Sequence, residues 1–230
     1  MQKRAKSLFA KKLRDRNKVA GALSRLVPDV EGKGVPKADV IIEAIFEDVA
    51  AKRALFAGVE ARTKDDAVLA TNTSAIPLAD IASVLKKPER LIGIHFFNPV
   101  AKMPLVEVVY DEKSDAGQVA RGAAFCSAIN RFPLPVKSSP GFLVNRVLAP
   151  YMAKAMSIHL ERNIPIEVLD KAATTFGMPM GPVELADTVG LDVCMKVVEM
   201  LGGESARQEA ALLQEKVDAG ELGKKSGKGF

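Results

Sequence analysis

The sequence has little cysteine, few aromatic residues and no tryptophan. Its two cysteines, Cys126 and Cys194, lie far apart and in no spacing typical of a metal site. We therefore expect two buried thiols in a reducing compartment, with no disulfide and no bound metal. Aromatic residues make up only 5% of the chain, which leaves few side chains on which nucleic-acid bases could stack.

Long apolar runs are also missing. No stretch reaches the roughly 20 apolar residues that a membrane-spanning helix needs, so no transmembrane segment is expected. The N-terminus is charged from its third residue and has no apolar core, so we expect no secretory signal. Apolar residues make up 48% of the 230 residues and charged residues 27%, which is typical of globular proteins. The length of 230 residues allows one large domain or two modest ones.

Positive charge is concentrated at the N-terminal end. Residues 1–27 hold nine lysine and arginine side chains against one acidic residue, Asp15, although the net charge of the whole chain is only +5. Leu8, Leu13 and Val19 are spaced as on a helix with one apolar side. Three interpretations stay open: the solvated face of a packed helix, a surface for the phosphates of an anionic ligand, and a transit peptide or nucleic-acid arm. The apolar positions favour the first. No nucleic-acid partner is expected, because recognition motifs are missing.

Residues 38–137 alternate between short apolar runs and segments with helical spacing. Strands are predicted at 39–46, 67–70, 91–96, 105–109 and 132–136. Helices are predicted at 48–62, 77–85 and 115–130. Strands that alternate with helices indicate a mostly parallel α/β sheet.

The pattern changes after the segment Lys137-Ser-Ser-Pro-Gly141. Four helices are predicted near 142–161, 165–176, 181–201 and 205–219, with glycine and proline at the breaks. The glycine-rich tail is expected to form a loop. We therefore divide the chain into an α/β domain over residues 1–137 and an all-helical domain over residues 138–230.

Two polar residues in predicted strands are candidates for chemistry. His95 closes one strand, where α/β sheets place ligands and reacting groups. Glu107 lies in the next strand on the side of Leu105 and Val109, so its carboxylate should be at least half buried and need a partner. If the strands are neighbours, that carboxylate would fix the tautomer of the imidazole and stabilise its protonated form. A structural histidine, and a glutamate paired with Lys or Arg, stay open as alternatives.

Small polar residues follow another predicted strand, at Thr71-Asn-Thr-Ser74. They are expected either to cap the helix that begins near Pro77 or to present a hydroxyl or amide at a ligand-binding edge. Asn145, near the start of the first helix of the second domain, could bring a further amide from across the cleft. The second histidine, His159, lies in a predicted helix without a motif and is expected in packing or at the surface.

Six segments then occur in order along the chain: Ile42-Glu-Ala-Ile-Phe-Glu47, Thr71-Asn-Thr-Ser74, His95-Phe-Phe-Asn-Pro99, Leu105-Val-Glu-Val-Val109, Pro140-Gly-Phe-Leu-Val-Asn-Arg146 and Met180-Gly-Pro-Val-Glu-Leu185. The ordered set resembles the L-3-hydroxyacyl-CoA dehydrogenase family of fatty-acid β-oxidation, especially the dehydrogenase region of bacterial multifunctional α-subunits. The resemblance implies a Rossmann-type, doubly wound α/β domain followed by an all-α domain. It also implies NAD-dependent oxidation of L-3-hydroxyacyl-CoA to 3-ketoacyl-CoA.

The resemblance further implies roles for single residues. His95 matches the catalytic base, and Glu107 matches its carboxylate partner. Ser74 and Asn145 match polar groups that position the substrate oxygen and stabilise charge developing on it. The positions that contact NAD in the family fall on Ile45, Phe46, Glu47, Lys52, Ser74 and Asn98.

The same resemblance implies three binding partners. These are an acyl-CoA substrate, a second copy of this chain bound through the helical domain to form a homodimer, and, as a further candidate, a thiolase subunit. The basic N-terminal segment falls where the family approaches coenzyme A, which favours the anionic-ligand interpretation. A bacterial cytoplasm is favoured over a mitochondrial matrix.

The sequence also departs from the family pattern. It has no counterpart of the opening strand, the G-x-G-x-x-G turn and the helix and strand that follow, a unit that cradles the pyrophosphate. We therefore expect a partial NAD-binding domain, from a fragment, a misplaced start or a degraded gene. The alternative to an active dehydrogenase is an impaired chain that binds acyl-CoA and dimerises but cannot hold NAD. A different NAD-linked hydroxyacid dehydrogenase is a second alternative, against which the strand positions of His95 and Glu107 argue.

Overall fold

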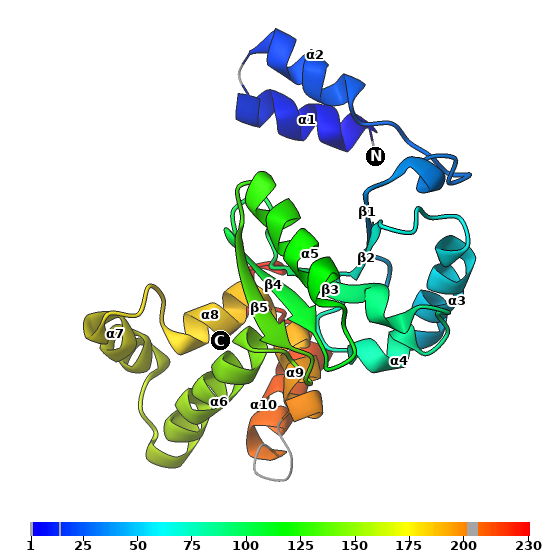
Figure 1. Cartoon of the computed structure of the whole chain (residues 1–230). Coiled ribbons are helices and arrows are strands. Elements are labelled where there is room, and N and C mark those ends of the chain that lie inside the picture. The colour runs from blue at the N-terminus through cyan, green and yellow to red at the C-terminus, as the bar shows by residue number, and fades with distance from the viewer. Residues whose placement is uncertain (1, 14, 202–206) are drawn as a thin grey trace.

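The computed structural model describes residues 2–13, 15–201 and 207–230 (Figure 1). Its centre is a five-stranded sheet, with a pair of helices before it and a group of helices after it. The strands, in spatial as well as chain order, are β1 (Val40–Glu43), β2 (Val68–Thr71), β3 (Leu91–Phe96), β4 (Leu105–Tyr110) and β5 (Phe132–Lys137).

The sheet is mostly parallel, which confirms the predicted class. Strands β1, β2 and β3 run parallel, β4 runs antiparallel to β3, and β5 runs parallel to β4. The reversal at β4 has a simple cause, because residues 97–104 are too few for the crossover that a parallel neighbour needs. Strand β1 ends earlier than predicted, where the Glu43 carboxylate accepts a hydrogen bond from the Ile45 amide at 2.6 Å.

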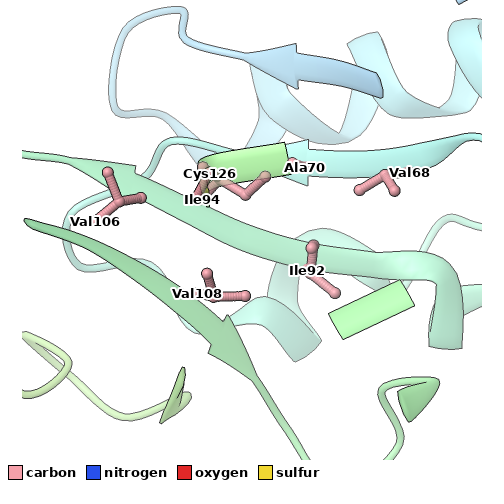
Figure 2. Close-up of a cluster of buried hydrophobic side chains, with 7 residues drawn as sticks. All are labelled: Val68, Ala70, Ile92, Ile94, Val106, Val108 and Cys126. Carbon is pink, nitrogen blue, oxygen red and sulfur yellow. The ribbon is translucent and has the colours of Figure 1, made fainter. Parts of the chain in front are cut away.

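Side-chain alternation divides the core between the two faces of the sheet. On one face, Ile94 and Val108 belong to a cluster that includes Cys126 of helix α5 (Ala116–Ala128), as Figure 2 shows. On the other face, Leu91 packs with Phe56 of helix α3 (Val49–Glu60) and with residues of helix α4 (Leu78–Ala82). Because alternate residues share a face, the odd-numbered positions of β3 and β4 point away from α5. Short 3-10 turns lie at Val35–Lys37 and Pro88–Arg90.

The basic N-terminal segment forms two helices, α1 (Gln2–Leu13) and α2 (Arg16–Ser24). Asp15 separates them because its carboxylate caps α2, accepting hydrogen bonds from two amides of the first turn. The pair lies apart from the sheet in Figure 1. No residue of α2 is buried, and Leu8 of α1 is 53% exposed. The two helices contact each other, and none of their described residues belongs to the core clusters of the sheet.

The C-terminal region contains α6 (Val144–Arg162), α7 (Ile166–Phe176), α8 (Pro182–Val189), α9 (Leu191–Leu201) and α10 (Arg207–Asp218). The single helix predicted over 181–201 is wrong, because Gly190, with φ of 107°, ends α8 before α9 begins. Leu191, Cys194 and Leu213 belong to the core of this region. Both cysteines are free and buried, as expected. None of the described helices is long and apolar enough to cross a membrane.

Candidate active site

The side chains of His95 and Glu107 meet on the sheet face opposite α5. The two residues are direct register partners in β3 and β4, and His95 Nδ1 lies 2.8 Å from Glu107 Oε2. His95 is 6% exposed and Glu107 is fully buried. Because a carboxylate only accepts hydrogen bonds, Nδ1 carries the proton of the neutral ring. The Nε2 atom is therefore left with the lone pair that a base needs.

The second oxygen of Glu107 is held by the helical region. Glu107 Oε1 accepts hydrogen bonds from the amides of Leu143 at 3.0 Å and Val144 at 2.9 Å. Val144 is the first residue of α6, so the carboxylate lies at the N-terminus of that helix, where a negative charge is stabilised. A single buried carboxylate thus joins the imidazole on the sheet to the first turn of α6.

Two aromatic rings restrict the imidazole. The Phe97 ring meets it edge-on with centroids 4.6 Å apart, and the Phe142 ring is tilted against it at 5.7 Å. Phe142 is only 1% exposed. The hydrogen bond at Nδ1 and these two aromatic neighbours together restrict the orientation of the His95 ring.

A second buried ion pair lies at the end of β1. Lys52 Nζ donates to both oxygens of Glu43, at 2.8 and 2.9 Å, and the Thr71 hydroxyl donates to Glu43 at 2.7 Å. The Lys52 side chain is 1% exposed and also lies 3.3 Å from Glu47 Oε2. The predicted cofactor-contacting lysine is therefore buried among carboxylates, with its ammonium turned toward Glu43 and Glu47.

Glu47 connects this ion pair to the segment after β2. Its Oε1 accepts hydrogen bonds from the Thr73 hydroxyl at 2.5 Å and from the Ser74 amide at 2.9 Å, with the Ser74 hydroxyl at 3.4 Å. Burial raises the pKa of Glu47, but the hydrogen bonds from Thr73 and Ser74 and the charge of Lys52 outweigh burial and leave the pKa below its ordinary value. The partly exposed carboxylate is thus held as an acceptor at the rim of the site.

The carboxyl ends of β1, β2 and β3 bring three predicted segments to one edge of the sheet: residues 45–47, 72–74 and 95–98. This edge is where open α/β sheets bind ligands. Phe46, Ser74 and Asn98 are exposed there, and Ile45 is 38% exposed. Asn145 lies part-buried in the first turn of α6. Over the described ranges, neither Ser74 nor Asn145 hydrogen bonds to His95.

Sequence reasoning missed Glu43 and Phe142, and it included Thr73 only as one of the small polar residues after β2. Glu43 carries the same signal that singled out Glu107, namely a carboxylate in an apolar strand, and it also proves to be buried. Phe142 gives no such signal, because its position beside His95 depends on the backbone conformation at this residue. His159 is bonded through Nδ1 to the Ile164 carbonyl at 2.8 Å, as expected of a packing residue. Among the residues that the structure describes, no group of His, Cys, Asp and Glu side chains is arranged to hold a metal ion.

Comparison with known proteins covers nearly the whole chain. Residues 1–139 match the family model of the 3-hydroxyacyl-CoA dehydrogenase NAD binding domain, and residues 141–230 match that of the C-terminal domain. The fatty acid oxidation complex subunit alpha of Vibrio campbellii is 42% identical over 194 residues, which are 84% of this chain and 27% of that protein. The corresponding subunit of Shewanella halifaxensis is 40% identical over 210 residues, covering 90% of this chain and 30% of that protein.

Solved structures agree with these matches. The structure of M. tuberculosis FadB2 superposes with a TM-score of 0.88 at 34% identity, covering 98% of this chain and 84% of that one. The 3-hydroxybutyryl-CoA dehydrogenase of Escherichia coli K12 gives a TM-score of 0.87 at 36% identity, covering 99% of this chain and 49% of that one. The chain spans less than a third of the length of the two curated relatives above.

Proposed function

This chain belongs to the 3-hydroxyacyl-CoA dehydrogenase family, and we propose that it oxidises the 3-hydroxyl of an L-3-hydroxyacyl-CoA with NAD as the hydride acceptor. The observation that carries the proposal is the buried pair of His95 and Glu107 at the ligand-binding edge of the sheet. Its Nε2 lone pair supplies the base that such an oxidation requires.

The residues at the sheet edge fit the nicotinamide end of NAD. Phe46 is 72% exposed beside Ile45, which provides an apolar surface for a ring. The held carboxylate of Glu47 is suited to accept from ribose hydroxyls, and the exposed side chains of Ser74 and Asn98 can hydrogen bond to a carboxamide. Lys52 would act here by holding Glu47 in place. When bound, NAD supplies the acceptor for the hydride that leaves C3.

The protein's own residues would handle the proton. His95 Nε2 accepts the proton of the 3-hydroxyl as the carbon–oxygen double bond forms, and the C3–H bond breaks with both electrons leaving as hydride. The imidazole becomes positively charged at that moment, and Glu107 stabilises the charge from 2.8 Å. Ser74 and Asn145 would hold the substrate oxygen and share its developing charge. In the reverse direction, protonated His95 returns the proton to the 3-keto oxygen.

Each part of the chain has a place in this proposal. Residues 1–137 would hold NAD and the dyad, and residues 138–230 would cover the acyl chain and form a homodimer. Helix α7 supports the dimer, because it has no buried residue and exposes Val168 by 53% and Phe176 by 89%. The exposed lysines and arginines of α1 and α2 would face the phosphates of coenzyme A.

Assembly and location are part of the same proposal. The matched relatives are bacterial and are named as subunits of a fatty acid oxidation complex. These names support assembly with a further subunit in a bacterium, and we propose that this subunit is a thiolase and that the location is the cytoplasm.

Turnover and calorimetry together test the proposed function. The chain is expected to oxidise NADH when supplied with acetoacetyl-CoA, and to release heat on binding both NAD and acyl-CoA. Folded protein without turnover would refute the activity. Heat from acyl-CoA but none from NAD would establish the alternative, a chain that binds acyl-CoA and cannot hold NAD.

A further inference from the structure

The chain enters α6 through an unusual turn at residues 141 and 142. Phe142 has a φ of 48°, in the left-handed region that bulky residues avoid. In the part of the chain that the structure describes, the other non-glycine residues with positive φ are both asparagines, which tolerate this conformation. A disfavoured conformation at a buried phenylalanine next to a reacting group requires a reason in the surrounding structure.

The turn directs two backbone amides at Glu107. Gly141, with φ of 73°, and Phe142 reverse the chain so that the next two amides, of Leu143 and Val144, donate to the same carboxylate oxygen. Successive amides pointing to one anion form a nest that fixes its position. Without this turn, one oxygen of a fully buried carboxylate would lose its donors.

The ring of Phe142 anchors the turn. It is 1% exposed and belongs to a core cluster with Leu78, Val109 and Val136. These partners come from the sheet and from α4, so the ring fastens the start of α6 to the α/β part of the protein. The same ring is tilted against the imidazole of His95, with centroids 5.7 Å apart.

We propose that Phe142 is a positioning residue for the His95–Glu107 pair. Its anchored ring maintains the left-handed turn, the turn presents two amides to Glu107, and Glu107 in turn fixes Nδ1 of His95. The first turn of α6, which carries Asn145, is thereby set relative to the imidazole. The catalytic consequence rests on the proposed function, whereas the positioning itself can be measured without turnover.

The chain has two histidines, so ring nitrogens labelled with ¹⁵N give two assignable sets of signals, with His159→Gln identifying each. The measured quantity is the exchange rate of the His95 Nδ1 proton with water. Phe142→Gly relieves the backbone but removes the ring, and we expect exchange to rise on the order of tenfold, as after losing one hydrogen bond to a charged group. Phe142→Leu keeps apolar bulk and should restore slow exchange. Phe132→Gly is the matched control, because that ring is 70% exposed.

The proposal would be overturned if the His95 Nδ1 proton exchanged as slowly in folded Phe142→Gly as in the unchanged protein. If the variant fails to fold, the unchanged protein decides the question through its amide exchange. The amides of Leu143 and Val144 should show the same protection, relative to their own unprotected exchange rates, as the His95 Nδ1 proton, since one opening event exposes all three. Much weaker protection of those amides would overturn the proposal.

The same variants separate this proposal from the proposed function. If the unchanged protein turns over, Phe142→Gly should lower kcat with little change in the KM for acetoacetyl-CoA, and Phe142→Leu should recover it. If the unchanged protein shows no turnover, the proposed function fails, while the exchange rates still decide whether Phe142 positions the pair.

Discussion

Replacing Glu107 by glutamine tests the link between hydrogen bonding and proton transfer. The carboxylate accepts from three donors: His95 Nδ1 at 2.8 Å and the amides of Leu143 and Val144 at 3.0 and 2.9 Å. A glutamine carbonyl can still accept from the two amides, which places its NH₂ group against Nδ1. The opposite orientation of the glutamine side chain is less favourable, because it places the NH₂ group against the two backbone amides, which are also donors. His95 Nδ1 must then accept a hydrogen bond from the glutamine NH₂ group, so the proton of the neutral imidazole moves to Nε2.

A proton on Nε2 removes the lone pair that the reaction uses. Holding a catalytic histidine in the wrong tautomer lowers kcat by about 10⁴-fold in serine proteases, and we expect a loss on the order of 10³–10⁴-fold for Glu107→Gln. Losing charge-assisted hydrogen bonds should also lower the free energy of unfolding by about 1–3 kcal/mol. Initial rates with acetoacetyl-CoA and NADH, together with thermal unfolding, measure both. Glu112→Gln, at an exposed position, is the matched control. A Glu107→Gln variant that keeps kcat within a few-fold of the unchanged protein would show that Glu107 does not set the tautomer that catalysis requires.

Three other predictions concern stability and reactivity. A Cβ at Gly181 would overlap the Asp170 carboxyl group that caps α8, so Gly181→Ala should lower the free energy of unfolding by about 1–3 kcal/mol in a denaturation experiment. Gly58→Ala, where the Cβ meets nothing within 4 Å, should raise it by about 0.5–1 kcal/mol. Burial raises the pKa of the Cys194 thiol to about 11, and Cys126 is also buried. Both cysteines should therefore react slowly with a thiol reagent at pH 8 until the protein is denatured. Rapid reaction of the folded protein would contradict this prediction. The depressed pKa of Glu47 stabilises the folded protein at pH values above the ordinary pKa of 4.5, and this stabilisation is lost as the pH falls through the depressed pKa. The melting temperatures of the unchanged protein and of Glu47→Gln should therefore differ at neutral pH and converge in acid. A melting-temperature difference that does not change with pH would count against the depressed pKa.

Much of the fold could be predicted because strands and helices leave strong periodic signals. Alternation placed Glu107 on the inner side of its strand, and the structure confirms that it is buried opposite His95. The break at Gly190 was missed because a single glycine within an apolar helical pattern is often tolerated, and only its φ of 107° shows that the helix ends there.

The candidate site could be predicted in part. Residue types and strand positions pointed to His95 and Glu107, and the structure brings these two into contact. The donors to the other oxygen of Glu107 are backbone amides, which are the same at every residue, so no sequence pattern could indicate them. Phe142 matters through a left-handed conformation that phenylalanine does not favour, and local sequence preferences therefore point away from its role.

The role of His95 as the base in the proposed oxidoreduction is tested by comparing the two histidines of the chain. His95→Gln and His159→Gln are assayed as folded proteins with acetoacetyl-CoA and NADH. Because a general base contributes about 10²–10⁴-fold, kcat should fall at least that far in His95→Gln and stay within a few-fold of the unchanged protein in His159→Gln. Equal rates in the two variants would contradict the assignment of His95 as the base.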